Sequence, residues 1–165
     1  MADHFFNNCY ENSGFELLSG KPVFTGKILG GCIDSIYDIF DNSRFEDTVS
    51  LCKKYDLFPS LDEWKNKILL LETSENKPEP KLYRKMIGAL KEYGIFDVLS
   101  GVLVGKPQDE VYYEEYKQIL LEEIGNKDLS IVYNINVGHS TPRCIIPFGV
   151  EAKVNVDKQV ITFDN

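Results

Sequence analysis

The sequence has 165 residues, of which 43% are hydrophobic, and 26 acidic side chains outnumber 18 basic ones to leave a net charge of −8. This composition predicts one folded domain whose core needs neither disulfides nor a metal ion. The acidic balance disfavours a groove along a phosphate backbone, so we predict no nucleic-acid partner. No apolar stretch is long enough to cross a membrane, and the first residues lack an export signal, which favours a cytoplasmic protein without a membrane partner.

Cysteine and histidine are sparse and widely spaced. The four cysteines are Cys9, Cys32, Cys52 and Cys144, and the two histidines are His4 and His139. This spacing matches neither a metal-binding pair nor the dense disulfide framework of a small secreted domain. We therefore predict reduced thiols, no metal and no cofactor.

The N-terminal third combines weak and strong patterns. Residues 1–20 are polar and rich in asparagine, with little periodicity, and are interpreted as a lead-in rather than a core element. Residues 22–31 predict a strand that ends in a glycine pair, and residues 33–40 a helix after it. A short helix is expected over 45–55, and the turn-forming residues Pro59 and Ser60 predict that 56–64 is a loop.

The centre of the chain alternates strands and helices. An unbroken apolar run predicts a buried strand at 67–71, and the apolar spacing predicts a helix over 82–93 that is closed by Gly94. A second strand is expected over 101–105, and a second helical face over 111–120. This alternation is typical of βαβ units with parallel strands.

The C-terminal part has a different pattern of apolar and polar residues. A strand is expected over 129–134, and apolar and polar residues then alternate over 145–147, 151–156 and 159–163. The Asp157-Lys158 pair predicts the turn of a hairpin between the last two segments. We therefore predict an α/β domain with a mostly parallel sheet, flanking helices and a C-terminal β-hairpin.

Two polar residues follow buried strands, where α/β folds tend to place reacting groups. Glu72 comes directly after the most hydrophobic strand, and His139 lies a few residues beyond the strand that ends near Asn134. A carboxylate that holds one imidazole nitrogen leaves the other free to take a proton from a nucleophile. The pattern alone leaves two simpler interpretations open, a satisfied loop histidine and a solvated or helix-capping glutamate.

A nucleophile is harder to find. No Gly-x-Ser-x-Gly elbow occurs, and Ser74 and Ser140 lie too close to the candidate carboxylate and base to serve. The charged residues Lys106, Asp109 and Arg143 are candidates to contact a substrate carboxylate or phosphate, but exposed turn charges are usually solvated, and we interpret them so.

Four segments in one order resemble the C-terminal half of the LD-carboxypeptidases, closest to the branch that contains the microcin C immunity proteins. They read GKILGGC at 26–32, KILLLETSE at 67–75, GIF with LSGVLVGKP at 94–107, and GHSTP with PFGV at 138–150. The resemblance runs from about residue 14 to the end.

The resemblance implies a cytoplasmic serine peptidase of two domains with its site at their interface. Residues 21–165 would be a swivelling-type C-terminal domain, and residues 1–20 the remnant of an interdomain connection. By motif match, Glu72 takes the orienting carboxylate role and His139 that of the general base, whereas Glu75 has no assigned role. The implied substrate is a muropeptide cut at an L,D-bond, or an acyl- or peptidyl-nucleotide conjugate such as microcin C; a homodimer is also implied.

The N-terminal nucleophile domain of the family is absent from these residues. Base and carboxylate without a nucleophile supply no acyl-enzyme route, so we expect the fragment to be inactive alone. The alternative interpretation is a non-catalytic binding or assembly domain that retains the scaffold. A reading frame that continues upstream into a serine-bearing segment would favour the peptidase.

Overall fold

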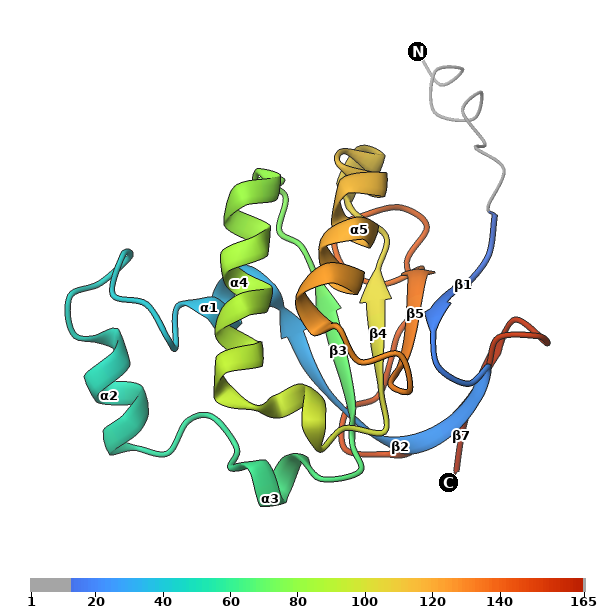
Figure 1. Ribbon diagram of the computed structural model, residues 1–165, viewed down its shortest axis with the longest axis horizontal. Coiled ribbons are helices and arrows are strands. Elements are labelled where there is room, and N and C mark those ends of the chain that lie inside the picture. Colours follow the sequence, from blue (N-terminus) through green and yellow to red (C-terminus); the bar gives the residue numbers. More distant parts are fainter. Residues whose placement is uncertain (1–12, 165) are drawn as a thin grey trace, which may run out of the picture.

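The computed structural model describes residues 13–164, which form a single sheet with helices packed on it (Figure 1). Within these residues seven strands lie in the order β1-β5-β4-β3-β2-β6-β7. The strands are β1 (Glu16–Ser19), β2 (Val23–Cys32), β3 (Ile68–Glu72), β4 (Gly101–Gly105), β5 (Ser130–Ile135), β6 (Glu151–Asn155) and β7 (Val160–Phe163). The helices are α1 (Ile33–Tyr37), α2 (Thr48–Lys54), α3 (Leu61–Trp64), α4 (Pro80–Tyr93) and α5 (Tyr113–Ile124), with 3-10 turns η1 (Ile95–Asp97) and η2 (Gln108–Glu110).

The centre of the sheet is parallel and its edges are antiparallel. Strands β2, β3, β4 and β5 pair in parallel, whereas β1 pairs antiparallel with β5, and β6 with β2 and β7. The first half of β2 pairs with β6 and its second half with β3, so one long strand joins the parallel core to the hairpin. The mixed α/β sheet and the C-terminal hairpin are as predicted.

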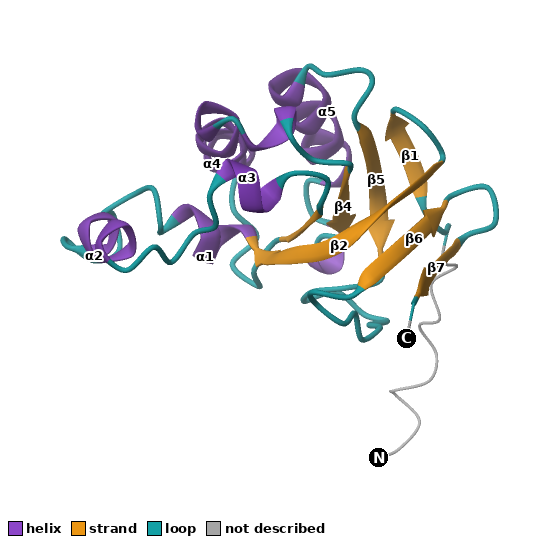
Figure 2. Ribbon diagram, turned by 90° about the horizontal axis from the view of Figure 1, so that it is seen from below, coloured by secondary structure: helices purple, strands orange, loops and turns teal. Residues whose placement is uncertain are grey.

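Both faces of the central strands are buried, which explains their apolar runs. Leu69 and Leu71 of β3 belong to a core under α4 and α5, and Ile68 and Leu70 to a second core on the opposite face. Figure 2 shows α4 and α5 together on one side of the sheet. Since side chains alternate along a strand, β3 supplies both cores at once.

The helix α4 follows from its sequence. Pro80 begins it, where a missing N–H costs no hydrogen bond, and Gly94 ends it in the left-handed conformation at φ 87°. Its buried residues are Tyr83, Met86, Ile87 and Leu90, at the spacing of one helical face.

Two predictions about the N-terminal third are wrong. Residues 16–19 are not merely a lead-in, because they form the edge strand β1 of the sheet, whose Glu16 lies opposite Tyr133. Residues 1–12 of that lead-in lie outside the described residues. Residues 56–64 are not all loop, because Ser60 and Glu63 cap each other's backbone and start the short helix α3, which buries Trp64.

Two predicted elements are shorter than expected or missing. The helix predicted over 33–40 ends at Tyr37 and continues as tight turns to Phe40. Residues 145–147 form no strand; they lie in the long loop 136–150, which we call the histidine loop because it carries His139. Ile145 is 95% exposed there, so the described residues cover almost none of its apolar side chain.

The described part of the chain contains no helix of the length and apolar character that crossing a lipid bilayer requires.

Candidate active site

Glu72 and His139 lie against each other although 67 residues separate them. Glu72 is the last residue of β3, and its Oε2 is 2.8 Å from Nδ1 of His139 in the histidine loop. The Glu72 side chain is 11% exposed and the His139 side chain 37%. The sequence predicted these two residues as a pair, and the fold brings them together at the carboxyl ends of the parallel strands.

Two glycines make room for the Glu72 side chain. A Cβ on Gly138 would lie 2.6 Å from Glu72 Oε2 and 2.7 Å from its Cβ. A Cβ on Gly105, at the end of β4, would lie 3.0 Å from the same Glu72 Cβ. Gly138 also has φ +92°, a conformation that other residues rarely adopt. The glycines of the GVLVG and GHSTP segments therefore let the histidine loop approach the carboxylate closely.

A second carboxylate reaches the other ring nitrogen. Glu75 Oε2 is 3.0 Å from Nε2 of His139, and the Glu75 side chain is 62% exposed. The imidazole thus lies between a buried carboxylate on Nδ1 and an exposed one on Nε2. Sequence patterns indicated Glu75 as a neighbour but gave no sign that it would contact the ring.

This arrangement raises the pKa of His139. The hydrogen bond to Glu72 is the largest cause; burial opposes it, and the charges of Glu72 and Glu75 and a hydrogen bond with the Thr73 backbone add to the rise. Both carboxylates stabilise the imidazolium, whose two N–H groups can donate to them. The Glu72 contact is the one that a catalytic base requires, because it leaves Nε2 to exchange a proton.

Comparison with known proteins decides the family. A family model, the LD-carboxypeptidase C-terminal domain, matches residues 25–154. The chain belongs to the LD-carboxypeptidase family. The match includes Glu72, Glu75 and His139, so the carboxylates and the imidazole belong to the C-terminal domain of an LD-carboxypeptidase.

Curated relatives of this LD-carboxypeptidase domain are longer than the chain. A protein with a carboxypeptidase name from Treponema pallidum (strain Nichols) is 26% identical over 153 residues, 92% of this chain and 40% of the relative. Another from Vibrio cholerae is 22% identical over 149 residues, 88% of this chain and again 40% of the relative. The chain therefore spans about two fifths of the length of these relatives.

Solved structures of the microcin immunity type have the same fold. An MccF-like protein from Streptococcus pneumoniae, solved in complex with AMP, is 57% identical with a TM-score of 0.92, over 94% of this chain and 45% of that one. The microcin C7 self-immunity protein MccF in its wild-type form is 19% identical with a TM-score of 0.67, over 94% of this chain and 42% of that one. The second likeness shows the fold alone.

The interpretation of Lys106 as a solvated turn charge is wrong. Lys106 directly follows β4, is 6% exposed, and pairs with Glu110 at 3.7 Å. Its position at the end of a buried strand, the signal that indicated Glu72, could have indicated it as well. Asp109 is exposed and pairs with Lys77 at 2.5 Å, and Arg143 is exposed in the histidine loop.

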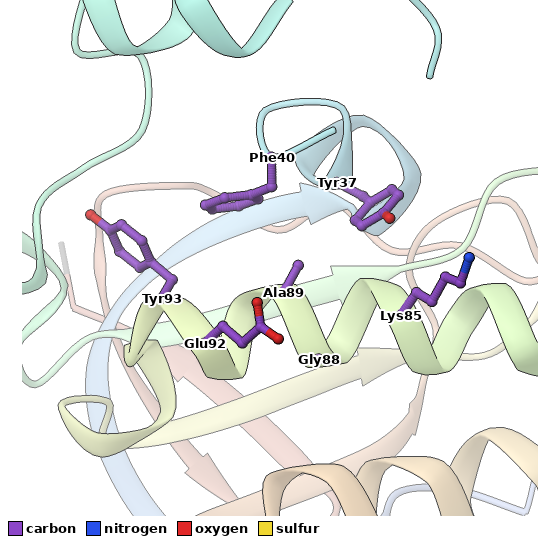
Figure 3. A pocket seen from close by; sticks show the side chains of 7 residues that line it. All are labelled: Tyr37, Phe40, Lys85, Gly88, Ala89, Glu92 and Tyr93. Carbon is purple, nitrogen blue, oxygen red and sulfur yellow. The ribbon is translucent and has the colours of Figure 1, made fainter. Parts of the chain in front are cut away.

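Two cavities lie beside other parts of the domain. One of about 540 Å³ is lined by Tyr37, Phe40, Lys85, Gly88, Ala89, Glu92 and Tyr93. Figure 3 shows Tyr37 and Phe40 facing α4 across it, near Ala89. The other, of about 590 Å³, lies between residues 13–15, β7 and the histidine loop at Cys144 and Ile145. Neither lining includes Glu72 or His139.

The described cysteines are unpaired thiols, namely Cys32, Cys52 and Cys144, and Cys9 lies outside the described residues. Burial is the main reason that the pKa of Cys32 is raised to about 11, so this thiol stays protonated at neutral pH. Across residues 13–164, no three His, Cys, Asp or Glu side chains gather as a metal-binding group. The absence of a metal and of a cofactor stays a prediction.

Proposed function

We propose that this chain is the base-bearing half of a serine-type carboxypeptidase, with His139 as general base and Glu72 as its orienting carboxylate. The observation that supports this most directly is the 2.8 Å contact between His139 Nδ1 and Glu72 Oε2. The two remaining requirements, a serine nucleophile and donors for an oxyanion, would come from a second domain.

The proposed reaction passes through an acyl-enzyme. The serine hydroxyl gives its proton to Nε2 of His139 as its oxygen attacks the amide carbonyl, and Glu72 stabilises the resulting imidazolium. Nε2 then returns the proton to the leaving amine as the amide C–N bond breaks. In the second half, a water molecule gives a proton to Nε2 as its oxygen attacks the ester carbonyl, and Nε2 returns that proton to the serine oxygen as the ester C–O bond breaks. Because Glu75 contacts the same nitrogen, its exposed side chain has to turn away before a serine hydroxyl can bind there.

The proposed partner is the nucleophile domain of the family. The chain covers 45% of the Streptococcus pneumoniae relative, which leaves more than half of that protein for other parts. The histidine loop, which also carries the proposed base, exposes Ile145 almost completely and Phe148 by about half. Apolar side chains in this position are suited to be covered by the domain that brings the serine. Dimerisation stays a prediction.

An acyl- or peptidyl-nucleotide conjugate is the substrate class that we propose first. The support is the relative of 57% identity whose structure contains AMP. A muropeptide with an L,D-bond is the second class, and the family name LD-carboxypeptidase supports it. The proposed compartment is the cytoplasm, in keeping with the unpaired thiols.

The experiment is hydrolysis of both substrate classes by the protein that joins this chain to its nucleophile domain. Replacing His139 with Ala should lower kcat by several powers of ten, because the triad loses its base. The matched control is His4→Ala, since His4 is the other of the two histidines and has no proposed role.

Hydrolysis that persists undiminished in His139→Ala would refute the proposal. Absence of hydrolysis in the unaltered protein, together with binding of either substrate, would instead support the non-catalytic binding domain.

A further inference from the structure

Asp34 contacts the loop that carries both carboxylates, although it lies outside the proposed triad. It is the second residue of α1, directly after β2, and it is half-buried. Its Oδ2 accepts a hydrogen bond from the Ser74 backbone N–H at 3.0 Å, and its Oδ1 accepts one from Ser74 Oγ at 2.9 Å. Hydrogen bonds to a carboxylate are roughly twice as strong as neutral ones.

Ser74 lies between the two residues that contact the imidazole. Glu72 precedes it by two positions and Glu75 follows it directly, and both carboxylates are within 3.0 Å of a ring nitrogen of His139. Ser74 is 6% exposed, so its bonds to Asp34 are largely protected from water. The two bonds therefore fasten the chain at a point between the two residues whose carboxylates contact the imidazole.

A further donor lies beside the Asp34 carboxylate. The Cys32 thiol lies 3.6 Å from Oδ2, within range of a weak S–H donor, and its raised pKa keeps that proton in place. In the parallel pairing of β2 and β3, Cys32 lies opposite Glu72. The start of α1 and the end of β3 are thus joined by the strand register and by the bonds from Asp34.

We propose that Asp34 is a positioning residue, which holds Ser74 so that Glu72, two positions before it, presents its carboxylate to Nδ1 of His139. Its effect on catalysis rests on the proposed function, whereas its effect on the geometry of the carboxylates does not. A misplacement of about 1 Å in a catalytic group can cost about a hundredfold in rate, so loss of the bonds from Ser74 to Asp34 should lower kcat strongly.

The first test follows the imidazole of His139 by NMR titration of this chain. The sequence has two histidines, so a His4→Gln background leaves one imidazole to observe. The groups that raise its pKa are Glu72, Glu75 and the Thr73 backbone, all within two positions of Ser74, which Asp34 holds. Asp34→Ala should therefore lower the pKa of His139, because the loop carboxylates are no longer held against the ring.

Two variants separate position from charge. Asp34→Asn removes the charge but keeps an acceptor for Ser74, so it should leave the pKa of His139 close to its original value. Asp38→Ala removes an equal charge from the end of the same helix, where Asp38 pairs with exposed Arg44 at 3.2 Å, and should also change little. Ser74→Ala loses one of the two bonds and should shift the pKa in the same direction as Asp34→Ala but less.

The proposal is overturned if Asp34→Ala leaves the titration unchanged, or if Asp34→Asn shifts it as much as Asp34→Ala does. The latter result would mean that the charge of Asp34 acts directly on the imidazole. Should Asp34→Ala fail to fold, as judged by circular dichroism, Ser74→Ala decides, and an unchanged titration in that variant overturns the proposal.

The second test measures hydrolysis in the protein that includes the nucleophile domain. Asp34→Ala should lower kcat about a hundredfold with KM changed less than about twofold, and Asp34→Asn should restore most of the rate. If hydrolysis survives His139→Ala, the proposed function fails, and the NMR titration still tests whether Asp34 positions Glu72 through Ser74. If His139→Ala abolishes hydrolysis and Asp34→Ala does not reduce it, only the positioning role of Asp34 is refuted.

Discussion

The carboxyl edge of the central strands and the segment 38–58 differ sharply in how their side chains are held. At the strand edge, Glu72 is mostly buried, glycines pack around it, and the nearby Ser74 is fastened to Asp34. The segment 38–58 includes α2, none of whose residues is buried, and Figure 1 shows this helix standing away from the sheet. Residues are thus placed with precision where strands from distant parts of the chain end together.

The difference has a simple energetic origin. The strand edge rests on two buried cores, which contribute most of the free energy of folding. Segment 38–58 packs against the core near its ends, through Phe40 and Phe58. Around α2 its contacts are local and polar, such as the bond from the Val49 N–H to Asn42 Oδ1 at 2.9 Å, and exposed contacts of this kind contribute little. Substitutions should therefore lower the free energy of unfolding strongly at the strands and weakly at α2.

The largest effect is expected for Leu69→Ala in β3. Leu69 is fully buried under the helices, so its truncation should lower the free energy of unfolding by about 2–5 kcal/mol. Urea unfolding followed by circular dichroism measures this loss. Leu69→Met, which conserves volume, is the control and should cost less than about 1.5 kcal/mol. A loss below about 1 kcal/mol in Leu69→Ala would contradict the claim that the strands contribute more to the free energy of unfolding than α2 does.

The next effect is expected for Gly138→Ala. The added Cβ would overlap Glu72 and sit on a residue with positive φ, so the free energy of unfolding should fall by about 1–3 kcal/mol. The change should also separate His139 from Glu72 and lower the pKa of the imidazole in an NMR titration. Gly149→Ala is the matched control, because Gly149 has φ +74° but open space around it. Equal losses in both variants would show that packing against Glu72 does not matter.

A smaller effect concerns pH. The pKa of His139 is raised in the folded state, chiefly by the Glu72 hydrogen bond, so its protonation stabilises the fold. This stabilisation is fully present below the unfolded pKa and is lost as the pH rises through the folded pKa. With the side chain 37% exposed and screened by water, it should reach at most about 1 kcal/mol. Urea unfolding of the original chain and of His139→Gln should differ most in acid, and a difference that grows toward alkaline pH would contradict the assignment.

The smallest effect is expected in α2. Leu51 is exposed, so Leu51→Ala should change the free energy of unfolding by less than about 0.5 kcal/mol. The same urea experiment measures it. A loss comparable with that of Leu69→Ala would mean that α2 contributes to the core after all.

Local patterns were sufficient for elements that carry their own signal. The apolar run of β3 and the helical face of α4 reflect burial on two faces and on one face, which a sequence records directly. The sequence gives no sign of strand β1, because its four residues are too short a pattern and are ordered by pairing with β5, a partner far along the chain. The helix α3 was missed because one capping box outweighs the loop-like composition around it.

For the site, the sequence by itself determined which residue types stand at the ends of buried strands, and so indicated Glu72 and His139 as a pair. Only the tertiary structure decided that Glu75 contacts the second ring nitrogen and that Asp34 holds Ser74. The physical reason is that burial follows from the period of nearby residues, whereas contacts between loops depend on how strands distant in the chain align. Alignment to within an ångström is set by packing across the whole sheet, and no short stretch of sequence contains that information.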